Sequence, residues 1–365
     1  MTVPTTTLID ARWPGLSGTS TFTRALLQGL SELDPPGRWL LWGPPEMVDP
    51  VRWRAAVRVP TTVPAVAWFG QRSALRVPPA DMVIHPHQTR PVHRFPAATC
   101  VLDLIQLQHP VASIRAAKSL RLRASVRAAR VLFTISSSVR DELTSTYGVE
   151  SSSVTVLELP VDQRSAERVA ARRSVRPSDR FIISIGRFTP HKNHPRLVAA
   201  FCRTRFAATG GELHLVGGTA GTLTLDGQRL PPGVRVLGPL DQSELEDALA
   251  SSTALVQASL VEGFGLPVAE ALAAGVPVVS SPVPAVTEFG PRGVPTFDPN
   301  SVHSIAEAID ATVDQVDKGT YWDHVDRVAW LTTRPTPRTL AQQVLDALER
   351  VSPGRGPDHE RGRLR

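Results

Sequence analysis

Short apolar runs alternate with amphipathic stretches along the whole chain. This alternation predicts strands that are each followed by a helix, and therefore an α/β fold. In the first half, the apolar runs predict strands at 6–11, 39–43, 81–85, 98–104, 131–136 and 154–159, and the amphipathic stretches predict helices at 19–33, 113–130 and 137–146.

The second half shows the same alternation more regularly. It predicts strands at 181–186, 212–217, 234–238, 254–259 and 277–281, a helix that begins at Pro195, and helices at 242–250, 267–274, 302–313 and 337–351. Repeated strand–helix units predict a parallel, doubly wound sheet, which binds ligands at the carboxyl ends of its strands.

The chain has 365 residues, a length that favours two domains. A polar, arginine-rich stretch at 162–180, which contains Pro177, is typical of an interdomain linker. We therefore expect two domains. Their predicted bounds are 1–162 for the N-terminal domain, 163–180 for the linker, 181–335 for the C-terminal domain, 336–351 for a final helix, and 352–365 for a disordered tail.

The composition is that of an ordinary globular protein, with 42% hydrophobic and 20% charged residues. Only Lys118, Lys192 and Lys318 are lysines, which leaves 37 arginines among the 40 basic residues. We attribute this bias to GC-rich coding, so the net charge of +6 does not favour nucleic-acid binding. Cys100 and Cys202 are too few for a disulfide framework or a zinc cluster and fit a reducing compartment. Without a predicted signal peptide or spanning segment, we expect a cytoplasmic protein.

One basic run stands out between Arg115 and Arg130, where six basic residues occur without an acidic one. The first interpretation, which we favour slightly, is an exposed helix face in an arginine-rich protein. The second is a surface that contacts an anionic membrane or a lipid-linked phosphate acceptor at the inner face of the membrane.

The segment 258–281 carries the most informative pattern. A buried strand leads to Glu262, glycines follow at 263 and 265, and Pro267 begins a helix that holds Glu270 in its first turns. The glycines and the helix N-terminus suit an anion, while carboxylates on both sides of it suit sugar hydroxyls. This combination predicts a nucleotide-sugar site, although a solvated loop glutamate gives the same local pattern.

A second loop presents cations at the same sheet edge. Arg187 and Lys192 follow the strand at 181–186, where they would neutralise a diphosphate. The alternative is that both residues are solvated loop cations. This alternative is easier to accept for Arg187, one of 37 arginines, than for Lys192, one of only three lysines. His191 and His194 flank Lys192 and are expected to be polar loop histidines.

Together these loops resemble the family 4 retaining nucleotide-sugar glycosyltransferases, part of glycosyltransferase group 1. The resemblance implies their GT-B fold, in which two Rossmann-like, doubly wound domains face a central cleft and the final helix crosses back to the N-terminal domain. The resemblance rests on Gly186, Arg187, Lys192 and Asn193, on Glu-Gly-Phe-Gly-Leu-Pro-x-x-Glu at 262–270, and on the Ala-x-Gly-x-Pro-Val-Val that follows. It is strong over 180–300 and weaker over 5–160, where Gly15 and Gly18 match the family's opening glycine loop.

The resemblance implies a role for each matching residue. Glu262 would bind hydroxyls of the transferred sugar, Glu270 the ribose, and Arg187 and Lys192 the diphosphate. Further donor contacts would come from Gly186, Gly263, Phe264, Gly265 and Leu266, and from Gly15 and Gly18 of the N-terminal domain. Asp103 would act at the reacting end, and it shares with His85, His87 and His109 a candidate role in acceptor contacts.

The implied reaction is transfer of a mannosyl, glucosyl or N-acetylglucosaminyl group from a GDP- or UDP-sugar to a hydroxyl of a sugar, a lipid-linked acceptor or a small molecule. It proceeds with retention and needs neither a metal nor a cofactor, and it would serve the biosynthesis of polysaccharides, glycolipids or glycosylated metabolites. Two alternatives remain open: a GT-B phosphorylase or nucleotide-sugar epimerase, and a non-catalytic GT-B binding subunit.

Two departures from the family pattern keep the last alternative open. Leu102 stands before Asp103 where many relatives have histidine, and Leu159-Pro160 stands where the interdomain turn often reads Asn-Gly.

Motifs of other nucleotide-binding enzyme classes are absent from the sequence. No Asp-x-Asp or Walker A motif occurs, and Val268 occupies the third glycine position of a dinucleotide fingerprint, which disfavours NAD.

Overall fold

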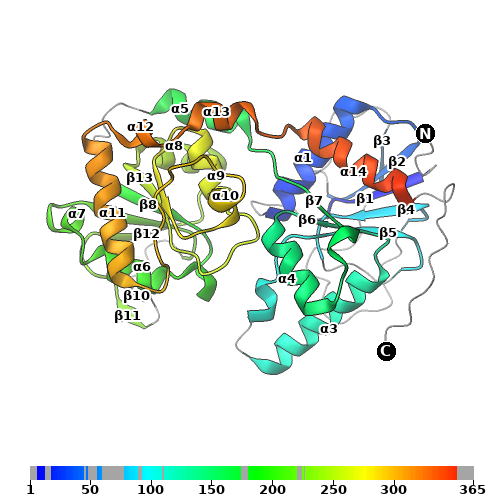
Figure 1. The fold of residues 1–365 in the computed structure, drawn as a ribbon, viewed down its shortest axis with the longest axis horizontal. Coiled ribbons are helices and arrows are strands. Elements are labelled where there is room, and N and C mark those ends of the chain that lie inside the picture. Colours follow the sequence, from blue (N-terminus) through cyan, green and yellow to red (C-terminus); the bar gives the residue numbers. More distant parts are fainter. Residues whose placement is uncertain are drawn as a thin grey trace. The chain divides into compact units, whose positions relative to one another are not determined.

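The computed structural model describes residues 6–12, 18–44, 47, 56–59, 78–88, 93–108, 111–173, 180–219, 224–225 and 227–351. The chain divides into two compact units (Figure 1). Unit 1 comprises Met1–Pro160 together with Pro335–Arg365, and unit 2 comprises Val161–Arg334.

Unit 1 contains a seven-stranded parallel sheet in the order β3-β2-β1-β4-β5-β6-β7. Its strands are β1 (Thr6–Asp10), β2 (Arg38–Trp42), β3 (Ala56–Val59), β4 (Met82–His85), β5 (Ala97–Val101), β6 (Val131–Thr134) and β7 (Val154–Val156). Its helices are α1 (Gly18–Leu33), α3 (Ala112–Ala128), α4 (Ser137–Tyr147) and α14 (Pro337–Val351). Apart from Thr6 at the start of β1, the residues of β1, β4, β5 and β6 are buried, as expected for a parallel sheet covered on both faces.

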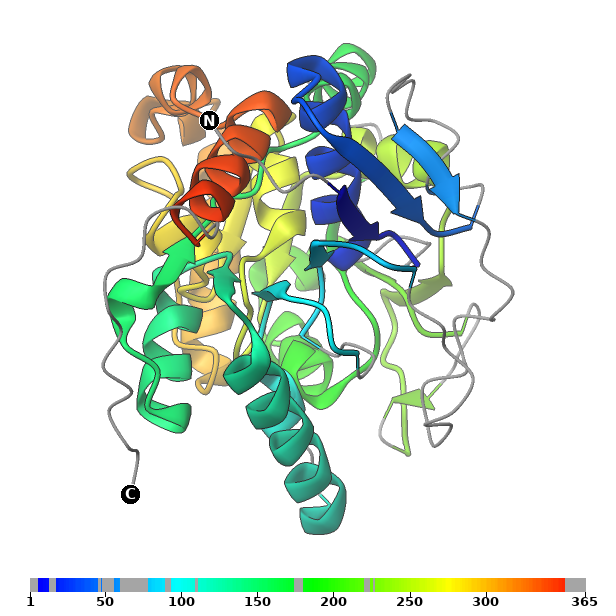
Figure 2. The ribbon, with the colours of Figure 1, turned by 90° about the vertical axis from the view of Figure 1, so that its right-hand side faces the viewer.

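The last helix, α14, packs along α1 within unit 1 (Figure 2). A side chain at Gly29 of α1 would meet the carbonyl oxygen of Pro337, so a glycine is needed for this close approach. Arg338 donates a hydrogen bond to the carbonyl oxygen of Glu32 over 3.0 Å. Apolar Leu340, Val344 and other residues at helical spacing are buried in the contact.

Unit 2 contains a five-stranded parallel sheet in the order β12-β9-β8-β13-β14. Its strands are β8 (Phe181–Ile185), β9 (Glu212–Val216), β12 (Val234–Gly238), β13 (Ala254–Gln257) and β14 (Val278–Ser280), and β10 (Thr224–Leu225) and β11 (Gln228–Arg229) form a separate hairpin. Its helices are α5 (Gln163–Arg172), α6 (His194–Phe201), α7 (Arg205–Ala208), α8 (Gln242–Ser251), α9 (Leu266–Ala273), α10 (Pro284–Thr287), α11 (Val302–Asp317), α12 (Tyr321–His324) and α13 (Arg327–Thr332).

The segment predicted as a linker differs from the expectation. Its first part, 163–172, is helix α5, which packs on α8 and α9 of unit 2. Ala166 and Val169 are buried on its inner face, and Arg168 pairs with the buried Glu246 of α8. The polar composition of this segment suggested a linker. In the structure, its charged residues instead bind a helix to the rest of unit 2. Residues 174–179 and the predicted disordered tail at 352–365 lie outside the described residues.

Several predicted strands are shorter in the structure. The strand predicted at 98–104 ends at Val101, because the backbone N–H of Leu102 donates to the side-chain oxygen of Gln88 instead of continuing the ladder. The strand predicted at 254–259 likewise ends at Gln257. The short elements β3, β10 and β11 were not predicted, because runs of two to four residues carry no clear periodicity.

Candidate functional site at the carboxyl edge of unit 2

Two loops lie at the point where the strand order of unit 2 reverses. One follows β8 and the other follows β13, which are neighbours in the sheet although β9 and β12 come between them in the chain. Such a switch point at the carboxyl ends of parallel strands is where open α/β sheets bind ligands. The two predicted groups of site residues, around Lys192 and around Glu262, stand on these two loops.

The structure brings Lys192 and Glu262 together as an ion pair, with Nζ and Oε1 2.5 Å apart. Only 13% and 11% of the two side chains are exposed. The same carboxylate oxygen accepts hydrogen bonds from Ser259 Oγ over 2.6 Å and from Gln257 Nε2 over 3.4 Å. Its second oxygen, Oε2, accepts none from the described residues. Glu262 is thus held in one orientation with one oxygen available to a ligand hydroxyl.

Gly186 makes room for the stem of Lys192. A Cβ at position 186 would lie 2.9 Å from Cε and 3.1 Å from Cδ of that lysine. Gly217, which has a φ of +110°, supports the same loop, since a Cβ there would lie 2.2 Å from the carbonyl oxygen of Gly186. Glycine is required at 217, because an L-residue would be strained by this φ and would clash with backbone.

Asn193 ties the two loops to each other. It adopts a φ of 61°, and its side-chain amide donates to the carbonyl oxygens of Ala258 over 3.0 Å and Pro299 over 2.7 Å. The N–H of Leu260 donates to the carbonyl oxygen of His191 over 2.7 Å. These bonds set the position of Lys192 relative to Glu262.

The glycine loop begins helix α9. Gly265 is the N-cap residue with a φ of 102°, and a Cβ there would lie 2.9 Å from Cγ2 of Val283. Phe264 is buried and its ring stacks on Phe289 with centroids 5.5 Å apart, so that ring belongs to the core. At the start of α9, Pro267 has no N–H, and the N–H groups of Val268 and Ala269 donate to the carbonyl oxygen of Gly265. An anion at this helix start is therefore left to N–H groups that precede Pro267.

Glu270 stands in α9 and lines a small cavity of about 20 Å³ among α5, α8 and α9, roughly the room that one water molecule needs. Burial, together with the nearby carboxylate of Asp162, raises the pKa of Glu270 to about 7. Its carboxyl group accepts no hydrogen bond from the described residues.

Other predicted residues are not brought to this pair. The Arg187 side chain is exposed and makes no hydrogen bond or ion pair with the described residues. Asp103 lies in unit 1, where its Oδ1 accepts from the N–H of Ile105 over 3.2 Å and begins a short 3₁₀ turn. Gly18 is the first residue of α1. Gly15 and His109 lie outside the described residues.

The histidines beside Lys192 differ in their surroundings. His194 is the first residue of α6 and only 2% exposed, so the expectation of a polar loop histidine is wrong for it. Its ring lies against Phe188 with centroids 4.6 Å apart and planes tilted by 42°, and burial together with the charge of Lys192 lowers its pKa to about 4. His191 stands in the loop, and burial lowers its pKa although Glu262 opposes the shift.

Sequence reasoning missed a buried polar cluster at the carboxyl edge of unit 1. Asp10, the last residue of β1, accepts two hydrogen bonds from the Arg12 guanidinium, over 2.7 and 2.8 Å, and lies 3.1 Å from His85 Nδ1. His85 Nε2 lies 2.8 Å from His93 Nε2, and Arg12 covers the ring of Trp42 at 3.7 Å. The available signal was that Asp10 and His85 lie at the carboxyl ends of the strands predicted at 6–11 and 81–85.

Burial by itself raises the pKa of Asp10, but hydrogen bonds from Arg12 and His85 outweigh it and hold the pKa well below its usual range. An ionised carboxylate only accepts hydrogen bonds, so His85 donates from Nδ1. In the part of the chain that the structure describes, no group of three or more His, Cys, Asp or Glu side chains could hold a metal ion.

Comparison with known proteins supports a shared origin for the second half. Residues 167–322 match the family described as glycosyl transferases group 1. Glycogen synthase of Mycobacterium tuberculosis is 31% identical over 196 residues, which are 52% of this chain and 47% of that protein. The O-antigen chain mannosyltransferase RfbU of Salmonella typhimurium is 24% identical over 249 residues, which are 66% of this chain and 67% of that protein. The chain thus spans about half the length of the glycogen synthase that it matches.

The fold is shared over nearly the whole chain. The crystal structure of Anabaena Alr3699/HepE in complex with UDP and glucose superposes with a TM-score of 0.67, covering 95% of this chain and 100% of that chain at 16% identity. The predicted GT-B fold, with two doubly wound parallel sheets, is confirmed.

Proposed function

We propose that this chain, whose residues 167–322 match the glycosyl transferases group 1 family, transfers a hexosyl group from a nucleoside diphosphate sugar to an acceptor hydroxyl, with retention and without a metal. Unit 2 binds the donor and unit 1 the acceptor. The RfbU relative is described as a mannosyltransferase and the Anabaena neighbour as a complex with UDP and glucose. These descriptions support a GDP- or UDP-hexose as donor and a glycan or glycolipid as product.

The Lys192–Glu262 ion pair is the observation that carries this proposal. A diphosphate at the start of α9 attracts the Lys192 ammonium away from Glu262. Glu262, still held by Ser259, then accepts hydrogen bonds from hydroxyls of the transferred sugar. As the bond to the sugar breaks, negative charge grows on the diphosphate, where Lys192 and the helix N-terminus stabilise it. Arg187 is exposed and can turn toward the same phosphates.

A thermal-shift panel of UDP-, GDP- and ADP-sugars tests the donor class directly. We expect one base to raise the melting temperature at saturating concentration, because a ligand that binds the folded state stabilises it by mass action. The Lys192→Ala variant should lose that shift. No shift with any donor would contradict the proposal and favour a non-catalytic subunit. Sugar interconversion without an acceptor, or release of a sugar phosphate, would favour an epimerase or a phosphorylase.

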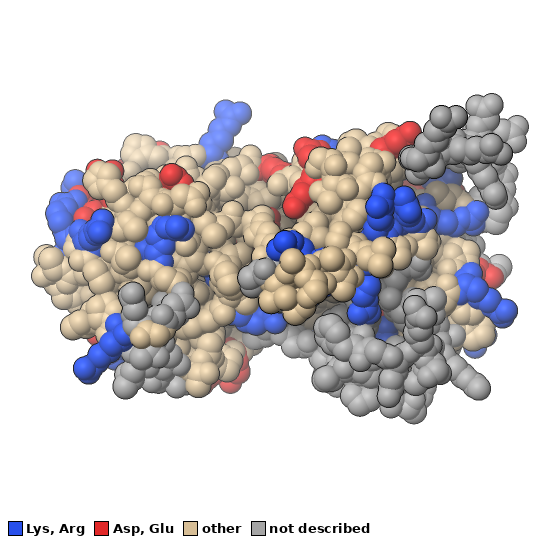
Figure 3. Space-filling model, turned by 90° about the horizontal axis from the view of Figure 1, so that it is seen from below, with Lys and Arg blue, Asp and Glu red and all other residues tan. Residues whose placement is uncertain are grey.

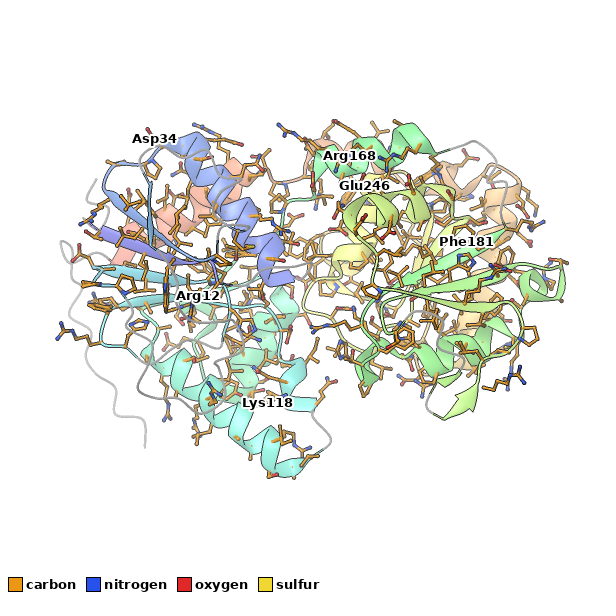
Figure 4. The ribbon with its side chains drawn as sticks, turned by 180° about the vertical axis from the view of Figure 1, so that it is seen from behind. Arg12, Asp34, Lys118, Arg168, Phe181 and Glu246 are labelled. Atoms are coloured by element: carbon orange, nitrogen blue, oxygen red, sulfur yellow. The ribbon has the colours of Figure 1, made fainter. Side chains whose placement is uncertain are left out.

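Helix α3 of unit 1 carries a second surface that bears on the proposed function, formed by exposed apolar and basic side chains. It extends outward from the sheet (Figure 2), and it buries only Leu122, Ser125 and Val126. Val111, Ile114 and Leu120 are 48%, 41% and 70% exposed. Of the basic residues of the run, α3 carries Arg115, Lys118, Arg121, Arg123 and Arg127, and Figure 4 labels Lys118 on it; Arg130 lies just beyond its end. Basic side chains also reach the face of the molecule seen in Figure 3.

An anionic bilayer is the partner that we propose for α3. Each basic residue near such a surface contributes about 1 kcal/mol, and the exposed apolar side chains can enter the interface. The protein then works at the inner face of a membrane, next to a lipid-linked acceptor. No helix among the described residues is long and apolar enough to cross a membrane.

Flotation with phosphatidylglycerol vesicles at low salt measures this contact. We expect the wild-type protein to float, and the double variant Arg123→Gln/Arg127→Gln to bind roughly thirtyfold more weakly, since two charges contribute about 2 kcal/mol. Arg203→Gln/Arg229→Gln changes the net charge equally in unit 2 and serves as the matched control. Absence of flotation, or equal loss in both double variants, would remove the membrane interaction.

A further inference from the structure

Two successive hydrogen bonds lead from the end of β13 to Glu262. Gln257, the last residue of β13, donates from Nε2 to Ser259 Oγ over 2.8 Å, and Ser259 Oγ donates to Glu262 Oε1 over 2.6 Å. Gln257 and Ser259 stand two residues apart, which places both side chains on one side of an extended chain. Each is only 1% exposed. The Gln257–Ser259 pair is therefore a buried support of Glu262 and not a solvated surface contact.

The direction of the two bonds follows from the chemistry of Glu262. A carboxylate only accepts hydrogen bonds, so the one hydroxyl proton of Ser259 is committed to Oε1 of Glu262. Ser259 Oγ can then only accept from Gln257, which must present its Nε2 rather than its Oε1. Gln257 Oε1 is left buried, and it accepts no hydrogen bond from the described residues. Because a buried acceptor without a partner is costly, this orientation of the amide lowers stability.

The end of β14 fixes the backbone beneath the pair. The N–H of Ser281 donates to the carbonyl oxygen of Gln257 over 2.9 Å, and its hydroxyl donates to the carbonyl oxygen of Ser259 over 2.6 Å. Ser281, which directly follows β14, is also only 1% exposed. Since backbone and side chains are both held, Glu262 Oε1 cannot turn away from Ser259 without leaving a buried hydroxyl unpaired.

Lys192 is the contact of Glu262 that a bound donor removes. In the proposed function, on which this inference rests, the diphosphate draws the Lys192 ammonium away from Oε1. We propose that Gln257 and Ser259 are positioning residues, which keep Oε1 occupied at that moment so that Oε2 alone meets the hydroxyls of the transferred sugar, and that the pair thereby sets which hexose the site accepts. One acceptor oxygen in a fixed place pairs with a hydroxyl of one configuration and is left unpaired by the epimer.

Titration calorimetry of the full chain tests the pair through the sugar end of the donor. The probes are UDP and GDP alone, and three pairs of epimers: UDP-glucose with UDP-galactose, UDP-N-acetylglucosamine with UDP-N-acetylgalactosamine, and GDP-mannose with GDP-glucose. We expect the wild type to bind one epimer of a pair at least about tenfold more tightly than the other. Ser259→Ala should reduce this preference at least about threefold and leave the affinity for the bare diphosphate unchanged, because Ser259 bonds Glu262 and not the phosphate loop.

Gln257→Met separates positioning from a structural role. Methionine has a similar length and removes both the donor and the unpaired oxygen, so we expect an unchanged or higher melting temperature together with a weaker epimer preference. Ser252→Ala is the matched control, since Ser252 is also buried and its hydroxyl donates to the carbonyl oxygen of Leu249, away from Glu262. In a Glu262→Ala background, Ser259→Ala should change the preference no further, because the pair acts through Glu262.

The outcomes separate this inference from the proposed function. A wild type that binds a bare diphosphate but binds both epimers of every pair equally would overturn the inference and leave the function in place. The same holds if Ser259→Ala keeps the full preference, or if it weakens the bare diphosphate and the sugar nucleotides equally, as a structural role would. Failure of every nucleoside diphosphate to bind would overturn both.

Discussion

Lys192→Ala is expected to lower kcat/KM for sugar transfer at least about tenfold, a loss of 1.4 kcal/mol or more of transition-state stabilisation. The variant removes the ammonium that pairs with Glu262 in the free protein and that we assign to the leaving diphosphate. Lys192→Arg keeps a charge but not the geometry of the stem over Gly186, so partial recovery is expected. Steady-state kinetics with the donor identified by thermal shift measures both variants.

Glu262→Ala should lower kcat/KM by a similar factor. In the double variant Lys192→Ala/Glu262→Ala, kcat/KM should fall by less than the product of the two single factors, because the two side chains contact each other. Lys318→Ala is the control, since Lys318 is exposed at the end of α11 in the same unit. Near-wild-type transfer in Lys192→Ala or in Glu262→Ala, with an unchanged melting temperature, would remove the site assignment.

Asp10→Ala is expected to lower the free energy of unfolding by about 3–5 kcal/mol, the usual cost of removing one partner from a buried ion pair. The Arg12 guanidinium, only 4% exposed, and the buried His85 would lose the carboxylate that both of them bond. Urea denaturation of the full chain, followed by tryptophan fluorescence, measures the change, since Trp42 lies under Arg12.

The effect of Asp10→Ala should depend on pH. A carboxyl whose pKa is held low in the folded state stabilises the fold above its unfolded value, here 3.8, and loses that contribution as the pH falls toward the folded value. The difference from wild type should therefore be full at pH 7 and smaller at pH 3. Asp141→Asn removes a surface pair and should cost less than about 1 kcal/mol. An effect of Asp10→Ala no larger than this control would contradict a structural role for the cluster.

The alternation of strands and helices was predictable because it depends on the spacing of apolar residues that are close together in the sequence. Each run that was predicted as a strand contains a strand of the structure, and the helices predicted at 19–33, 242–250 and 337–351 match α1, α8 and α14 closely. The two site loops were predictable for a related reason. Glycine at 186 and 265 and a rare lysine at 192 are residue types that a backbone or a phosphate requires at a given position.

Helix α5 was not predictable from its composition. Four arginines, a glutamate and few apolar residues at 163–173 read as linker, because the partner that makes them a docked helix, Glu246, lies more than 70 residues further along the chain. The pairing of Asp10 with His85 was hidden for the same reason, since it depends on β4 lying beside β1 in the sheet.

By itself, then, the sequence determined the α/β class, the order of the elements and the loops that carry Lys192 and Glu262, since these depend on neighbouring residues. Only the tertiary structure decided which side chains meet. Strand order set β13 beside β8, and this brought Ser259 and Lys192 onto one oxygen of Glu262 and left the other oxygen open. Contacts between residues far apart in the chain depend on packing, which no local pattern records.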